Sequence, residues 1–190
     1  LAAPEAVRVL DAGGADLVIV ETVGVGQAEV EVATAADTTL VVVAPGWGDA
    51  VQASKAGILE IADVFVVNKA DRPGADDATR DLEVMLRMGP ELDWTPPVVR
   101  TSTHAHEGID DLWEAIEAHR KHLESTRELE RRRRSRILRE VEDMVSVRLR
   151  ARAAELLERG ALESVADDLV ARRVDPYRAA DILVERMEQR

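Results

Sequence analysis

Four short apolar runs are the feature that most constrains the fold of this chain. They are rich in Val and Ile and do not alternate with polar residues, which is typical of strands buried on both faces of a parallel sheet. Stretches of about 15 to 30 residues separate them, the length that a crossover helix needs. The runs are Leu17–Val20, Leu40–Val43, Val64–Val67 and Val98-Val99. This alternation of strand and helix signals predicts a three-layer α/β domain.

Helical spacing of apolar residues lies between and after these runs, over residues 27–36, 49–62 and 108–122. No strand signal follows residue 122. Residues 124–159 are predicted to form one long charged helix, and further helices are predicted with breaks at Gly160 and near Asp175-Pro176. We therefore expect an α/β domain over residues 1–123 and a helical region over residues 124–190.

The long helix carries an apolar stripe among its Arg and Glu residues. The stripe has the three- and four-residue spacing of one helix face and consists of Ile137, Val141, Met144, Val145 and Leu149. A helix of this length cannot bury such a stripe against itself. The stripe is therefore expected to pack on the α/β domain or to meet another chain.

Charge and cysteine content exclude several classes of protein. The net charge of -12 argues against general nucleic-acid binding. The chain has no Cys, which excludes disulfides and thiolate metal sites and suits a cytoplasmic protein. No apolar run reaches the roughly 18 residues of a membrane span, so we expect no membrane partner.

Polar residues follow all four runs, and the carboxyl ends of parallel strands meet at one edge of a sheet. The four sets are Glu21–Gly24, Pro45–Asp49, Asn68–Asp71 and Thr101–Thr103. Any one of them could be a turn, because Gly, Asn and Asp favour turns. Four sets at one edge predict a ligand-binding crevice instead.

Asn68-Lys69-Ala70-Asp71 has the form Asn-Lys-x-Asp, the guanine-reading motif of G-proteins. The Asp71 carboxylate can accept hydrogen bonds from the ring N–H and the exocyclic amino group of guanine, a pair that adenine lacks. Asn68 can tie neighbouring loops together, and the stem of Lys69 can cover the base. Backbone N–H groups of Ser102 and Thr103 are expected to close the pocket, with His104 in the loop beside it.

Glu21-Thr22-Val23-Gly24 suits the phosphate end of the same crevice. A carboxylate at a strand end can hold a water bound to Mg²⁺, and Gly24 lets its backbone N–H approach a terminal phosphate. Glu in place of the commoner Asp points to the SIMIBI branch of the P-loop NTPases. That branch includes metallochaperone and cofactor-chaperone GTPases.

The chain resembles the MeaB/ArgK family of G-protein chaperones, which are often labelled LAO/AO transport system ATPases or kinases. The motifs that carry the resemblance are ETVGVGQAE (21–29), PGWGDAVQASKAGILEIADVFVVNKAD (45–71) and GIDDLWEAI (108–116). The C-terminal VADDLVARRVDPYRAADILVERM resembles the family tail, and Ala28 replaces the usual Ser.

The resemblance implies a SIMIBI-type G domain, a parallel sheet with helices on both faces, and a C-terminal dimerisation region. It implies GTP or GDP with Mg²⁺ as cofactors and adenosylcobalamin-dependent methylmalonyl-CoA mutase as the client of a GTP-hydrolysing chaperone. Catalysis is expected to involve Glu21, Gly24 and Gln27. A further switch, which relays nucleotide state to the mutase, is expected to use Trp47, Asp49, Gln52 and Lys55.

Members of this family also carry a Gly-rich phosphate loop that ends in Gly-Lys-Ser/Thr, and no such pattern occurs in these 190 residues. The chain therefore resembles the later part of such a protein, incomplete at the N-terminus. Phosphoryl transfer depends mostly on positioning and electrostatic stabilisation. We expect the chain to be inactive without that loop.

Two other functions fit part of the pattern. A nickel-type metallochaperone GTPase shares the Glu-x-x-Gly feature, although absent Cys and sparse His count against it. A truncated, nucleotide-free dimer that acts through its helical tail is the third possibility.

The pairs His104/His106 and His119/His122 have spacings that can bind a metal, but no carboxylate or Cys pattern supports a zinc site.

Overall fold

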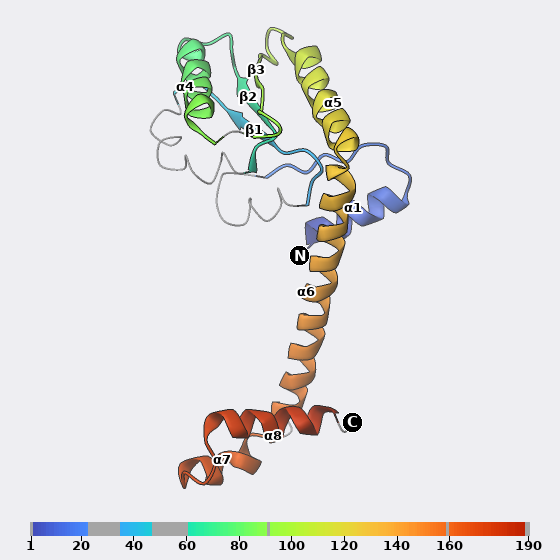
Figure 1. Ribbon diagram of the computed structural model, residues 1–190, viewed down its shortest axis with the longest axis vertical. Helices are drawn as coiled ribbons and strands as arrows, with labels where there is room; N and C mark the ends of the chain where they lie inside the picture. Colours follow the sequence, from blue (N-terminus) through green and yellow to red (C-terminus); the bar gives the residue numbers. More distant parts are fainter. Residues whose placement is uncertain (1, 23–34, 47–60, 91, 159, 189–190) are drawn as a thin grey trace. The chain divides into compact units, whose positions relative to one another are not determined.

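Three parallel strands form the sheet of the computed structural model, in the order β1-β2-β3 (Figure 1). They are β1 (Leu40–Val43), β2 (Val64–Asn68) and β3 (Val98–Thr101). The structure describes residues 2–22, 35–46, 61–90, 92–158 and 160–188. Three of the four apolar runs are therefore confirmed as strands of one parallel sheet.

Strand β2 is the centre of this sheet. Val42 of β1 pairs with Val66, and Val66 in turn pairs with Val99 of β3. The side chains of Val64 to Val67 are at most 2% exposed. A strand with a neighbour on each edge and side chains covered on each face has no polar position to fill, which explains its unbroken Val/Phe sequence.

The fourth run, Leu17–Val20, is not a strand in this structure, so that prediction was wrong. These residues form no ladder with the described sheet, and the side chain of Ile19 is 83% exposed. A strand requires a neighbouring backbone as well as apolar side chains. The composition of residues 17–20 could not show whether a neighbouring strand is available to pair with them.

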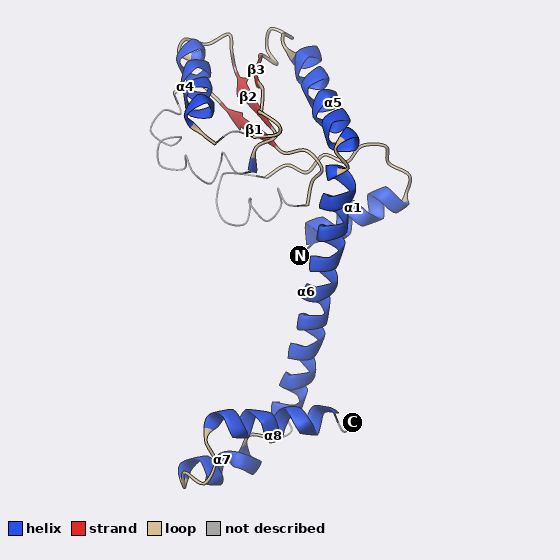
Figure 2. Cartoon of the chain, in the orientation of Figure 1, coloured by secondary structure: helices blue, strands red, loops and turns tan. Residues whose placement is uncertain are grey.

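Helices make up most of the remaining described residues (Figure 2). They are α1 (Ala2–Ala12), α4 (Ala75–Met88), α5 (Ile109–Ser125), α6 (Glu128–Glu158), α7 (Glu163–Val170) and α8 (Pro176–Glu188). The helix predicted at 108–122 is confirmed as α5. The long helix predicted at 124–159 is confirmed as α6, which begins after a turn at Thr126 and Arg127. The helical patterns at 27–36 and 49–62 fall almost entirely outside the described residues.

The main core lies between the sheet and α4. Phe65 and Val67 of β2 pack with Val41 and Val43 of β1 and with Leu82 of α4. Helices α4 and α5 lie on the two sides of the sheet (Figure 1). The predicted arrangement, a parallel sheet with helices on both faces, is therefore confirmed.

The chain divides into two units, residues 1–136 and 137–190. In the second unit α7 and α8 pack through the buried side chains of Val165 and Ala179, and Arg186 donates to Ser164 Oγ at 2.6 Å. The five side chains of the α6 stripe are between 41% and 59% exposed. Among the described helices, none is long and apolar enough to cross a membrane.

We expect Phe65→Ala to lower the free energy of unfolding by about 3–5 kcal/mol, because it leaves a cavity between β2 and α4. Urea unfolding measures this loss. Val42→Ala is the control, because Val42 is 51% exposed on β1 and its truncation should cost about 1 kcal/mol or less. Equal losses in the two variants would contradict the proposed core.

Candidate functional site

The end of β2 turns sharply at Asn68 and Lys69. Asn68 Oδ1 accepts the Lys69 N–H at 2.7 Å and lies 3.4 Å from the Thr101 hydroxyl oxygen of β3. Lys69 has a φ of 58°, in the left-handed region that non-glycine residues seldom adopt. Strained residues of this kind occur at ligand-binding sites, where the surrounding contacts hold them in place.

The residues after Lys69 are fastened to the end of β3. The Ala70 N–H donates to Thr101 O at 3.0 Å, and the Arg72 N–H closes a turn onto Lys69 O at 2.9 Å. The Arg100 side chain donates to Asp76 Oδ1 at 2.5 Å and reaches Ala70 O at 3.4 Å. The loop over Asn68–Asp71 therefore has a defined conformation relative to both strands.

Asp71 is the exposed carboxylate of this loop. The Ser102 hydroxyl donates to Asp71 Oδ1 at 2.5 Å and accepts the Ala105 N–H at 3.1 Å. This hydrogen bond from Ser102, followed by one from the backbone of Asp71 itself, holds the pKa of Asp71 below its usual value. Asp71 is therefore ionised at neutral pH and acts as an acceptor.

The loop after β3 is closed at its base by a backbone pair. The N–H and C=O groups of Ser102 and Glu107 bond reciprocally, each at 3.0 Å. Gly108 follows with a φ of 73°, and a Cβ built on it would lie 1.9 Å from Arg100 O. Only glycine fits this close approach. Thr103 and His104 lie in the exposed loop that the pair closes.

The sequence placed Ser102 at this site but for a different reason. Its backbone N–H, expected to face the ligand, donates to Glu107 O instead. Ser102 is 1% exposed, and its contribution is the hydroxyl that holds Asp71. The spacing of 31 residues between the two gave no signal of this hydrogen bond, because it depends on the pairing of β2 with β3.

The remaining predicted site residues are not part of this loop or lie outside the described residues. Glu21 is exposed and follows residues 17–20, which form neither a helix nor a strand. Within the described ranges, no group of three or more His, Cys, Asp or Glu side chains could hold a metal ion. Six predicted site residues lie outside the described residues: Gly24, Gln27, Trp47, Asp49, Gln52 and Lys55.

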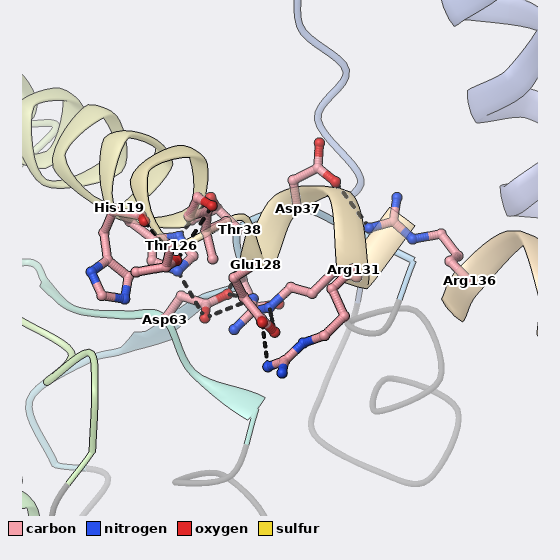
Figure 3. Close-up of polar contacts among 12 residues, drawn as sticks. Asp37, Thr38, Asp63, His119, Thr126, Glu128, Arg131 and Arg136 are labelled. Atoms are coloured by element: carbon pink, nitrogen blue, oxygen red, sulfur yellow. Dashed lines mark hydrogen bonds and ion pairs between the residues drawn. The ribbon is translucent and has the colours of Figure 1, made fainter. Parts of the chain in front are cut away.

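A second polar cluster lies where the strands begin, and its centre is Asp63 (Figure 3). Asp63 immediately precedes β2 and is 8% exposed. Its Oδ2 accepts the Thr39 N–H at 2.8 Å, and Arg132 of α6 donates to its Oδ1 at 3.1 Å. The indole N–H of Trp94 donates to Asp63 O at 2.8 Å.

His119 of α5 completes this cluster and is fully buried. A hydrogen bond of 2.9 Å joins its Nδ1 to the Thr38 hydroxyl oxygen. Its Nε2 lies 3.2 Å from Asp63 Oδ1, with the geometry of an ion pair rather than of an aligned hydrogen bond. The Trp94 ring lies against His119, with 5.0 Å between the ring centroids.

A neighbouring carboxylate, Asp37, binds the next residues of α6. Arg133 donates to Asp37 Oδ2 at 2.5 Å, and Arg136 donates to Asp37 Oδ1 at 2.9 Å and to Ala36 O at 3.0 Å. Asp37 and Asp63 thus attach the first turns of α6 to the segments that precede β1 and β2. Neither carboxylate was predicted to have a role, since each resembles an ordinary turn residue before a strand.

Burial alone would raise the pKa of both carboxyl groups, but their partners more than offset it. For Asp63 the offsetting groups are His119, the Thr39 N–H and Arg132, and its pKa is lowered. For Asp37 they are Arg133 and Arg136, and its pKa is lowered too. Both groups are therefore held in the charged form.

The chain is similar to known proteins over most of its length. A family model described as "Methylmalonyl Co-A mutase-associated GTPase MeaB" matches residues 1–157. A protein of Pyrococcus abyssi named as a GTPase is 43% identical over 185 residues, which are 95% of this chain and 57% of that protein. The mitochondrial methylmalonic aciduria type A homolog of Mus musculus is 34% identical over 137 residues, 69% of this chain and 33% of that protein.

A solved structure is also similar. The crystal structure of an LAO/AO transport system kinase matches with a TM-score of 0.67 and 26% identity, over 97% of this chain and 61% of that one. The chain therefore spans less than two thirds of the length of each of these three proteins.

The two lowered pKa values predict an acid-sensitive fold. A carboxyl group whose pKa is lowered in the folded state stabilises that state fully at a pH above its pKa in the unfolded chain, which is 3.8. This stabilisation is lost as the pH falls through the lower pKa of the folded state. We expect the free energy of unfolding, measured in urea, to fall from about pH 4 downward. The Asp63→Asn variant should have a lower free energy of unfolding than the parent at pH 6, and this free energy should fall less than that of the parent on acidification. An equally steep acid dependence in this variant would contradict the assignment.

Proposed function

Because this chain belongs to the MeaB family of methylmalonyl Co-A mutase-associated GTPases, we propose that the complete protein binds GTP and GDP with Mg²⁺ and hydrolyses GTP. Asp71 carries this proposal. Its exposed, ionised carboxylate follows a rigid central strand and is held by the Ser102 hydroxyl at 2.5 Å. An acceptor fixed in this way suits a ligand that presents two adjacent N–H donors, as guanine does.

The residues around Asp71 have matching roles in this proposal. Lys69 is exposed and adopts a left-handed backbone conformation at the turn that follows β2. The aliphatic stem of its side chain would cover the face of the base. Asn68 holds that turn through the Lys69 N–H. Thr103 and His104, in the loop closed by Ser102 and Glu107, border the other side of the base.

For the phosphate end we propose Glu21, Gly24 and Gln27. Mg²⁺ supplies positive charge that offsets the charge on the phosphate oxygens when it is bound. Glu21 would hold a water on that ion, a role that needs one exposed carboxylate. Gly24 would offer its backbone N–H to the terminal phosphate, and Gln27 would orient the attacking water.

We further propose that the protein is a chaperone of an adenosylcobalamin-dependent methylmalonyl-CoA mutase in the cytoplasm. The description of the family and the name of the mouse relative support this client. The segment that follows β1 would relay the nucleotide state to the mutase through Trp47, Asp49, Gln52 and Lys55. Residues 1–123 would form the G domain and residues 124–190 the helices of a homodimer.

Asp71→Asn in the complete protein should weaken GDP and GTP binding by about 10⁴-fold or more, because a site built for paired polar contacts is left mismatched. The same variant should bind xanthine nucleotides better than the parent, since xanthine has an acceptor where guanine has an amino group. Titration calorimetry with guanine and with xanthine nucleotides measures the affinity of the variant and of the parent for each.

Asp77→Asn is the matched control, because Asp77 is an exposed carboxylate on α4 that pairs with Arg80 outside the loop. This control should leave both affinities unchanged. Unchanged GDP affinity in Asp71→Asn would remove Asp71 from the base pocket and with it the support for a guanine nucleotide.

The exposed α6 stripe supports the dimer. Replacing Val141 and Val145 together with Glu should place like charges in the interface, and sedimentation at micromolar concentration should then detect monomers. Val147→Glu is the control, since Val147 is equally exposed on α6 but lies off the stripe. A parent that is already monomeric, or a double variant that remains dimeric, would rule out this interface.

A further inference from the structure

We propose that Asp63 and Arg132 are positioning residues for the guanine loop, Asn68–Asp71, and that they act on it through strand β2. The name of the loop rests on the function proposed above. Asp63 and Arg132 meet at the amino ends of the strands, and the loop lies at the carboxyl ends. Neither residue touches the loop, so any effect on it has to pass along the strand.

The contacts of Asp63 join the start of β2 to the segments before β1 and β3 and to helices α5 and α6. Its carboxylate binds the Thr39 N–H before β1, contacts His119 of α5 and accepts Arg132 of α6. Its backbone oxygen accepts the Trp94 indole N–H from the segment before β3. Groups from the segments before two strands, β1 and β3, and from two helices, α5 and α6, therefore hold this one residue in place.

Strand β2 is suited to carry that position to its other end. It has five residues, a length of about 17 Å, with Asp63 before its first residue and Asn68 as its last. Val64, Phe65 and Val67 are fully buried, so the strand cannot bend without moving its close-packed neighbours. A displacement at Asp63 is therefore expected to reach Asn68, whose side chain sets the strained turn at Lys69.

Arg132 connects α6 to Asp63, the residue that precedes this strand. It donates to both carboxylate oxygens of Asp63, at 3.1 and 3.4 Å, and its Nε donates to Glu128 Oε1 at 3.3 Å. Arg133 and Arg136 hold the same turns of α6 to Asp37, before β1. How firmly the first turns of α6 are held thus affects how firmly the guanine loop is held. Such coupling is reciprocal, so the guanine loop affects the first turns of α6 by the same free energy.

Hydrogen exchange in the full-length protein tests this link without a ligand. Arg132→Ala keeps a strong helix former in α6 and removes the guanidinium, so the helix itself should persist. We expect amide exchange in the guanine loop to accelerate by about 2- to 30-fold, with Ala70 N–H, bonded to Thr101 O, as the main probe. Amides in the middle of α4 are the internal reference for a general loss of stability.

Two further variants separate positioning from charge and from local packing. Asp63→Asn keeps the shape of the side chain and an oxygen for the Thr39 N–H but loses the charge that attracts Arg132, so it should accelerate the same amides. Arg120→Ala removes an exposed pair with Glu124 on α5 and should change nothing in the loop. Faster exchange confined to residues 128–136, or equal acceleration in the loop and in α4, would overturn the proposal.

GDP titration adds a readout at the site itself. Arg132→Ala should weaken GDP binding by a factor similar to the acceleration in the loop, while Arg132→Lys, which retains the charge, should recover part of it. GDP affinity unchanged in Arg132→Ala would overturn the positioning role. A parent protein that does not bind GDP would refute the proposed function, and the exchange comparison would still decide whether β2 links the two ends.

Discussion

The buried carboxylate of Asp63 connects several segments of the first unit. A buried charge is tolerated only when hydrogen bonds and opposite charges surround it, and removing one partner of such a pair costs about 3–5 kcal/mol. Asp63 obtains its partners from the segment before β1, from α5 and from α6. Helices α5 and α6 are thus the helices that supply charged or polar partners to this group at the base of the sheet. Apolar packing against β2 would not by itself select among helix positions.

The parts of the fold that follow from local pattern were predictable, and those that depend on a partner were not. Val64–Val67 is apolar throughout because both faces are covered, so sequence identified it as a central strand. Leu17–Val20 is equally apolar but pairs with no strand of the described sheet. Asp63 resembled a turn residue, since its partners His119 and Arg132 are 56 and 69 residues away in sequence.

The candidate site divides in the same way. The spacing of Asn68, Lys69 and Asp71 after a buried strand predicted a hydrogen-bond acceptor at the carboxyl edge, and the structure brings Ser102 to that edge. The chemical role of Ser102 was not predictable. Its hydroxyl, not its amide, reaches the loop, because the amide pairs with Glu107. Side-chain roles of this kind depend on angstrom-scale geometry that residue spacing does not encode.

The loop between Ser102 and Gly108 has an evolutionary consequence. Its two ends are fixed, one by the buried Ser102 and the other by a glycine that no residue with a Cβ can replace beside Arg100 O. The side chains of residues 103–106 between them are exposed. Natural variation can therefore accumulate in the middle of this loop while its span and attachment stay constant. Related proteins could in this way differ in the side chains of residues 103–106 while keeping the same fold.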